Sequence, residues 1–126
     1  MVKAILIPFI ILVSICFSNA PLHSSTKLIG YKESGKASFY DMNFQSSETA
    51  SGERFNQSEK TAAHKWLPFG TKVRVTNVIN GQSVVVIIND RGPFAKGRII
   101  DLSHSAFSSI GNTNSGVISV DIEVIE

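Results

Sequence analysis

The stretch VVVIINDRGPF, residues 84–94, constrains the fold more than any other part of the sequence. Its first five residues are all apolar and predict a strand that is buried on both faces, and therefore rigid and dry. Asp90 follows this strand, and Arg91-Gly92-Pro93 then ends it. A carboxyl group at the mouth of such a strand is expected to have its charged form disfavoured by desolvation. Desolvation of this kind prepares a proton donor that works near neutral pH.

Three other segments have the two-residue period of half-buried strands. Residues 37–40, 71–76 and 118–124 each alternate apolar with polar side chains. Residues 98–100, which follow a glycine, predict one more strand. Asn80-Gly81 predicts a type I′ hairpin that leads into the strand at residue 84.

Two short helices are predicted between these strands. Ser58 is expected to cap a helical turn through Ala63, and Ser103 a helix that runs to about Ile110, with Gly111 after its end. The fold class is therefore mainly β, with about six short strands and one or two short helices. A closed barrel suits this set better than an open sheet with unpaired edges.

The N-terminal segment has the features of a secretory signal. Lys3 is its only charge, and an apolar run follows that Pro8 interrupts and that is too short for a stable membrane span. We expect residues 1–18 to be removed, with cleavage after residue 20 as the alternative. Residues 19–34 then form an N-terminal lead-in, and residues 35–126 form one domain.

The composition limits the classes of partner and cofactor. The only cysteine, Cys16, lies in the signal segment and follows Ile15 rather than a small residue, so neither a disulfide nor a lipid anchor is expected. The formal net charge is +2 and falls to +1 without Lys3. Without a basic stripe, no nucleic-acid partner is expected. We predict an exported monomer of the periplasm, cell envelope or extracellular space that carries no cofactor.

Three titratable residues stand out, each with a structural alternative. Asp90 can supply a proton or can cap the turn made by Gly92 and Pro93. His64 can act in the chemistry, or be a structural histidine bonded to a neighbouring backbone group. Glu53, in SGERF, residues 51–55, can contact a ligand or be a solvated surface charge.

Five blocks of sequence together resemble the rare lipoprotein A (RlpA) family of bacterial lytic transglycosylases. They are GKASFY, SGERF, TAAHKWLPFGTKVRVTN, VVVIINDRGPF and GRIIDLSHSAF, in this order from Gly35 onward. The resemblance implies a double-psi β-barrel. It also implies cleavage of the bond between N-acetylmuramic acid and N-acetylglucosamine in peptidoglycan strands poor in stem peptides, which leaves 1,6-anhydro ends. The family's first block commonly has tryptophan and glycine where this sequence has Phe39 and Asp41.

Carried over by position, the resemblance implies that Asp90, Glu53 and His64 are the catalytic residues. In a lytic reaction the C6 hydroxyl of the substrate attacks the anomeric carbon, so one carboxyl group is enough to donate and then take up a proton. Asp90 is assigned this role. Arg91, Trp66 and Tyr40 are candidate substrate-binding residues, the aromatic rings by stacking on sugars.

Other functional classes remain open from the sequence. A non-catalytic, expansin-like module that binds or loosens cell-wall glycan is the main alternative, and a glycan hydrolase that uses water is another. His64, Glu53 and Asp90 are chemically able to bind zinc, but they lack a compact ligand spacing, so no metal is predicted. No serine lies in a nucleophile-elbow sequence.

Overall fold

The structure, a computed structural model, describes residues 28–126. The predicted signal segment, its cleavage site, and all of the predicted lead-in before Leu28 lie outside the described residues. In the part of the chain that is described, no helix is both long and apolar enough to cross a membrane.

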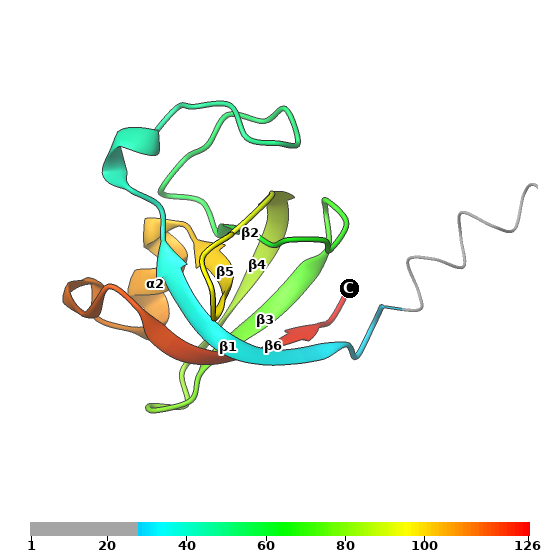
Figure 1. Cartoon of the computed structure of the whole chain (residues 1–126), viewed down its shortest axis with the longest axis vertical. Coiled ribbons are helices and arrows are strands. Elements are labelled where there is room, and N and C mark those ends of the chain that lie inside the picture. Colours follow the sequence, from blue (N-terminus) through cyan, green and yellow to red (C-terminus); the bar gives the residue numbers. More distant parts are fainter. Residues whose placement is uncertain (1–27) are drawn as a thin grey trace, which may run out of the picture.

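Six strands close into a barrel, as Figure 1 shows. Around the barrel the strands follow the order β1-β5-β2-β4-β3-β6, in which β1 pairs with β5 and β2 with β4 in parallel. The other four pairings are antiparallel. The predicted six-stranded barrel is therefore confirmed. The strand bounds are β1 (Lys32–Phe39), β2 (Thr61–Ala63), β3 (Lys72–Asn77), β4 (Ser83–Asp90), β5 (Arg98–Leu102) and β6 (Ile118–Val124).

The alternating strands place one set of side chains inside the barrel. Along β3 the buried residues are Val73, Val75 and Asn77, while the residues between them are more exposed. In β6, every second residue from Val120 to Val124 is buried in the same way. Each fully buried valine or isoleucine contributes roughly 1.5–3 kcal/mol relative to an exposed one. This core fixes the register of the strands that carry the site.

The prediction that β4 is buried on both faces is wrong. Val86 and Ile88 are fully buried, but Val85 and Ile87 are 43% and 42% exposed. In a closed barrel one face of every strand points outward, and within the described residues no layer covers this part of β4 completely. The apolar run therefore reflects an apolar outer surface as well as a core.

The predicted helical turn from Ser58 to Ala63 is also wrong, because its last three residues form β2. Ala62 lies opposite Ile88 of β4 on one side and Leu102 of β5 on the other. Hydrogen bonding to both neighbours outweighs the helix preference of alanine, which is a weak local effect.

The hairpin between β3 and β4 forms, but its turn is not type I′. That turn needs positive φ at both central residues, and among the described residues Gly81 has φ +75° while Asn80 is not in the positive region. The connection is instead a longer loop that closes with hydrogen bonds from Asn77 N to Gln82 O and from Gly81 N to Asn77 O, both 2.8 Å.

The predicted second helix is confirmed as α2 (His104–Ile110). The Ser103 side chain accepts a hydrogen bond from Ala106 N, which satisfies one of the free N–H groups of the first turn. Ala106, Phe107 and Ile110 are buried against the barrel. Two 3-10 helices, η1 (Met42–Phe44) and η2 (Thr113–Ser115), complete the described elements.

A long loop, residues 40–60, arches over the end of the barrel where β4 ends (Figure 1). Aromatic packing holds it: the Tyr40 ring stacks on Phe55 with ring centroids 4.2 Å apart, and Phe44 packs against both rings. The Gln57 amide also donates to Tyr40 O. The loop therefore has a defined conformation where it passes Asp90.

Candidate active site

Asp90 is the last residue of β4, and its carboxylate is held from three directions. Its side chain is largely buried, at 9% exposure. Oδ2 accepts a hydrogen bond from the Tyr40 hydroxyl at 2.6 Å, and Oδ1 accepts from the backbone N–H groups of Ala50 at 2.8 Å and Arg91 at 2.9 Å. Both carboxylate oxygens are therefore oriented by donors from two places in the long loop, Tyr40 and Ala50, and from Arg91, the residue after β4.

The three donated hydrogen bonds are divided unequally between the two carboxylate oxygens of Asp90. The Tyr40 bond involves one oxygen and the two backbone bonds the other. Oδ2 is therefore the oxygen that can exchange a proton after the loss of a single hydrogen bond.

Tyr40 lies closer to the chemistry than its predicted role of stacking on a sugar implies. Its ring face is already stacked on Phe55, and its hydroxyl points to Asp90. Burial, and then the hydrogen bond to Asp90 and the charge of that residue, raise the pKa of Tyr40 well above its usual range. At neutral pH the hydroxyl therefore stays protonated and donates to the carboxylate.

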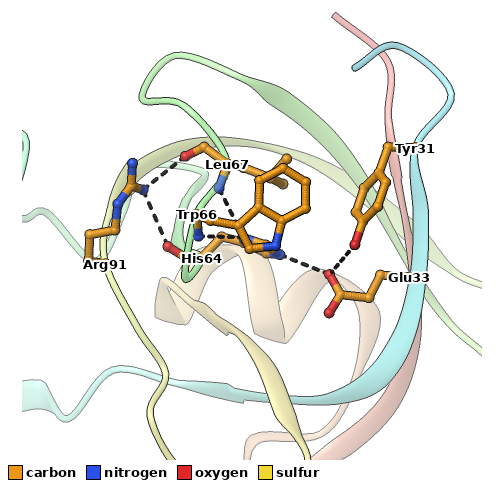
Figure 2. A network of polar contacts seen from close by, with 6 residues as sticks. All are labelled: Tyr31, Glu33, His64, Trp66, Leu67 and Arg91. Carbon is orange, nitrogen blue, oxygen red and sulfur yellow. Dashed lines mark hydrogen bonds and ion pairs between the residues drawn. The ribbon is translucent and has the colours of Figure 1, made fainter. Parts of the chain in front are cut away.

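His64 is only 1% exposed, and both of its ring nitrogens have partners (Figure 2). Nδ1 accepts hydrogen bonds from the backbone N–H groups of Trp66 and Leu67, both at 3.2 Å. Nε2 then carries the hydrogen and donates to Glu33 Oε1 at 2.9 Å. This is the structural alternative considered for the histidine, because its lone pair cannot act as a base without loss of both backbone bonds.

The histidine network includes two residues that the sequence analysis did not single out. Glu33 of β1 accepts from His64 and, at 3.4 Å, from the Tyr31 hydroxyl. The Tyr31 ring meets Trp66 edge-on, with centroids 5.0 Å apart (Figure 2). Tyr31 and Glu33 fall within the predicted lead-in, residues 19–34, yet β1 already begins at Lys32. The segment Gly30-Tyr31-Lys32-Glu33-Ser34 has no apolar–polar alternation that would mark a strand, so the sequence carried no clear signal for either residue.

Arg91 binds backbone carbonyls rather than a carboxylate. Its Nη1 donates to Leu67 O at 2.8 Å and to His64 O at 3.3 Å (Figure 2). The guanidinium group lies 4.1 Å from the centroid of the Phe69 ring. Arg91 and His64 thus hold the turn 64–67 from both sides. In this position Arg91 fixes the backbone next to Asp90, and its contact with glycan stays a prediction.

Glu53 and Trp66 are accessible from solvent. Glu53 is exposed in the long loop, where the Ser51 hydroxyl donates to its Oε1 at 3.3 Å. The loop reaches β4 through a hydrogen bond from Ser51 N to Asn89 O. Trp66 is 48% exposed, so part of the residue is accessible to a ligand. Both positions are compatible with the predicted contacts to sugar.

The described residues bring the predicted catalytic side chains together only in part. The backbone N–H of His64, the residue after β2, donates to Asp90 O at 3.2 Å, and Ala63 pairs with Asp90 in the parallel β2–β4 pair. The imidazole, however, bonds Glu33 and not Asp90. Within residues 28–126 no three histidine, aspartate or glutamate side chains lie close enough to hold a metal ion. Among the described residues, the side chain that bonds directly to the Asp90 carboxylate is Tyr40.

Comparison with known proteins identifies the family of this barrel. The family described as lytic transglycolase matches residues 32–122. Over 92 residues the chain is 58% identical to a probable endolytic peptidoglycan transglycosylase RlpA of Synechocystis. The chain belongs to this family. The resemblance to rare lipoprotein A and the double-psi β-barrel fold are thereby confirmed.

Other matches show how far the family likeness extends. The endolytic peptidoglycan transglycosylase RlpA of Pasteurella multocida is 50% identical over 103 residues, which are 82% of this chain and 35% of that protein. The Synechocystis match covers 73% of this chain and 29% of the relative. The matched segments thus make up about a third of these family members. Among solved structures, a Streptomyces papain inhibitor has a TM-score of 0.65 at 24% identity, covering 78% of this chain and 97% of the inhibitor, and shares the fold alone.

Proposed function

We propose that this barrel is a lytic transglycosylase that cleaves the glycosidic bond between N-acetylmuramic acid and N-acetylglucosamine in peptidoglycan and leaves 1,6-anhydro ends. The observation that carries the proposal is the setting of Asp90, a buried carboxylate at the end of β4 whose oxygens are oriented by Tyr40, Ala50 and Arg91. The identity of 58% to a probable peptidoglycan transglycosylase, across most of the barrel, supports the same substrate class.

In the proposed first step Asp90, in its protonated form, donates its proton from Oδ2 to the bridging oxygen of the glycosidic bond. The C–O bond to the departing sugar breaks, and positive charge develops at the anomeric carbon. Oδ2 is the oxygen involved because its only partner among residues 28–126 is the Tyr40 hydroxyl, whereas Oδ1 is fixed by two backbone N–H groups. Positioned proton transfer of this kind contributes roughly a hundredfold to ten-thousandfold in rate.

In the second step the C6 hydroxyl of the same muramic acid attacks the anomeric carbon and loses its proton to the Asp90 carboxylate. A 1,6-anhydro ring forms, the carboxyl group regains its proton, and no water is consumed. The Tyr40 hydroxyl supports this step because it donates to the ionised carboxylate that exists between the two steps.

The other predicted residues take supporting roles in the proposal. Glu53, which is exposed beside the end of β4, is placed to interact with positive charge or with sugar hydroxyl groups. Trp66 is half exposed and can contact the glycan strand of the substrate. His64 and Arg91 act as positioning residues, because their hydrogen bonds hold the turn 64–67 against the backbone of Asp90. Peptidoglycan lies outside the cytoplasmic membrane, so the proposal includes export directed by residues 1–18 and action as a monomer.

Replacement of Asp90 tests this function. Asp90→Asn keeps an acceptor for the Ala50 and Arg91 N–H groups but cannot carry the transferred proton, so we expect release of fragments from purified peptidoglycan to fall at least a hundredfold with an unchanged unfolding curve. Asp121→Asn, an exposed site on β6, is the matched control and should retain full activity. Cleavage by Asp90→Asn at the control rate would remove Asp90 from the mechanism. If the unmodified chain binds peptidoglycan but releases no fragments from it, the expansin-like alternative is favoured.

A further inference from the structure

An open depression lies between the end of the long loop and the outer face of β2 and β4. Its volume is about 500 Å³. Thr61, Ile87 and Asn89 line it from the two strands, and the loop contributes charged side chains that include Glu53, Arg54 and Lys60. Asn89 immediately precedes Asp90 on β4, so the depression lies one residue along the strand from the proposed catalytic residue, whose own side chain does not line it.

Two of the side chains that line this depression each have a buried polar atom without a partner among residues 28–126. Asn89 Oδ1 and Thr61 Oγ1 are both buried and accept or donate no hydrogen bond within residues 28–126. Asn89 as a whole is only 6% exposed. Buried polar atoms are nearly always paired, because each unpaired one costs the free energy of its lost hydration. The only other such side-chain atom in the described part of the chain is Nε of Arg98, which is not one of the residues that line this depression.

The remaining lining restricts the chemistry of a ligand. Ile87 is 42% exposed and offers an apolar surface beside the two polar groups. The acidic residues Glu53 and Glu59 are balanced by Arg54 and Lys60, so the rim carries no net formal charge. A ligand that fits is therefore neutral and combines an amide with a small apolar group. An anion would gain little from a rim of zero net charge.

We propose that this depression is a subsite for the acetamido group of an N-acetylated amino sugar in the glycan strand. The amide N–H of the sugar donates to Asn89 Oδ1, the Thr61 hydroxyl donates to the acetamido carbonyl oxygen, and the methyl group packs on Ile87. Rotation about χ2 of Asn89 and χ1 of Thr61 turns both groups toward the ligand. The inference rests on the proposed function for its place beside Asp90, and it assigns the part of the sugar that the barrel recognises.

Binding measurements test the subsite separately from catalysis. The full chain carrying Asp90→Asn, which does not cleave, is titrated with a hexamer of N-acetylglucosamine and with cellohexaose, which lacks acetamido groups. We expect the N-acetylated hexamer to bind about tenfold more tightly, as one or two buried hydrogen bonds allow. NMR shifts should concentrate on Thr61, Ile87 and Asn89. Equal affinity for the two sugars, or shifts confined to other strands, would overturn the inference.

Substitutions at the depression complete the test. Asn89→Leu and Thr61→Val keep the approximate shape and remove the polar atoms, so each should weaken binding of the N-acetylated hexamer about tenfold and leave cellohexaose binding unchanged. Arg98→Lys removes the unpaired atom outside the depression and is the matched control. The ligand comparison needs neither variant, so it decides the question even if Asn89→Leu fails to fold. If unaltered affinity is found in both folded variants, the subsite is refuted.

The outcomes also separate this inference from the proposed function. A chain that prefers the N-acetylated hexamer but releases no anhydro fragments from peptidoglycan supports the subsite and contradicts the transglycosylase. A chain that cleaves normal and de-N-acetylated peptidoglycan equally well supports the transglycosylase and overturns the subsite.

Discussion

At the scale of single residues, the hydrogen bonds of Asp90 and His64 explain their different roles. Asp90 retains one oxygen with a single donor, while both ring nitrogens of His64 are occupied. The sequence could locate both residues but could not assign their partners. The Tyr40–Asp90 bond joins positions 50 residues apart, and the partner of His64 is 31 residues away in β1.

The alkaline titration of Tyr40 tests its buried contact with Asp90. The pKa of Tyr40 is raised above the ordinary value, first by burial and then by Asp90. A group whose pKa is raised on folding contributes its full stability below the unfolded pKa, about 10 for tyrosine, and loses it as the pH rises through the folded value. The free energy of unfolding should therefore fall above about pH 10, and less steeply in Tyr40→Phe. Urea denaturation followed across this pH range measures both slopes.

Tyr31→Phe provides the comparison, because the chain has two tyrosines and burial also raises the pKa of Tyr31, which lies nearer the surface. If Tyr40→Phe has the same alkaline slope as the unmodified chain, the hydroxyl is not held in the way the structure shows.

Replacement of His64 should affect stability more than replacement of Glu53. His64→Ala leaves the N–H groups of Trp66 and Leu67 without their acceptor and removes the partner of Glu33. We expect a loss of about 2–4 kcal/mol in the free energy of unfolding. Glu53→Ala changes an exposed loop residue and should stay within about 0.5 kcal/mol, while it lowers cleavage activity. Urea unfolding of both variants is the measurement, and equal stability of the two would contradict the positioning role of the histidine.

At the scale of elements, a strand could be predicted where its apolar and polar residues alternate. The strands β3 and β6 have six and seven residues with clear alternation, and both were predicted. β2 has three residues, two of them alanine, and only its pairing with β4 and β5 makes it a strand. The predicted type I′ turn before β4 is wrong for a related reason. The Asn80 side chain donates to Ile110 O, so contact with the end of α2 helps to set the loop.

Close packing of β1 on β5 gives a prediction at this scale. A Cβ atom added at Gly35 would lie 2.7 Å from Ile99 Cγ2, too close for any real contact. Gly35→Ala should therefore destabilise the barrel by about 1–3 kcal/mol, as overpacking does. In the background of Ile99→Ala, which removes the clashing atom, the same change should cost little, and thermal unfolding of the four proteins gives the coupling. An equal cost in both backgrounds would show that the glycine is needed for another reason.

At the scale of the whole molecule, closure of the barrel brings the site together. Tyr40 follows β1, Asp90 ends β4 and Ala50 lies in the loop between β1 and β2, and hydrogen bonds to the Asp90 carboxylate bring all three together. The number of strands and the closed architecture followed from alternation and from the need to avoid free edges. The path of the loop 40–60 did not, because aromatic contacts of Phe44 and Phe55 with Tyr40 fix it.

The central claim is that the substrate's own hydroxyl, and not water, completes the reaction after Asp90 has donated its proton. The most direct test is digestion of purified peptidoglycan by the full chain in water enriched in ¹⁸O, followed by mass spectrometry of the released fragments. We predict 1,6-anhydro ends without incorporated ¹⁸O, and no such fragments from Asp90→Asn. Reducing ends that carry the label would show that water is the nucleophile and would contradict the account.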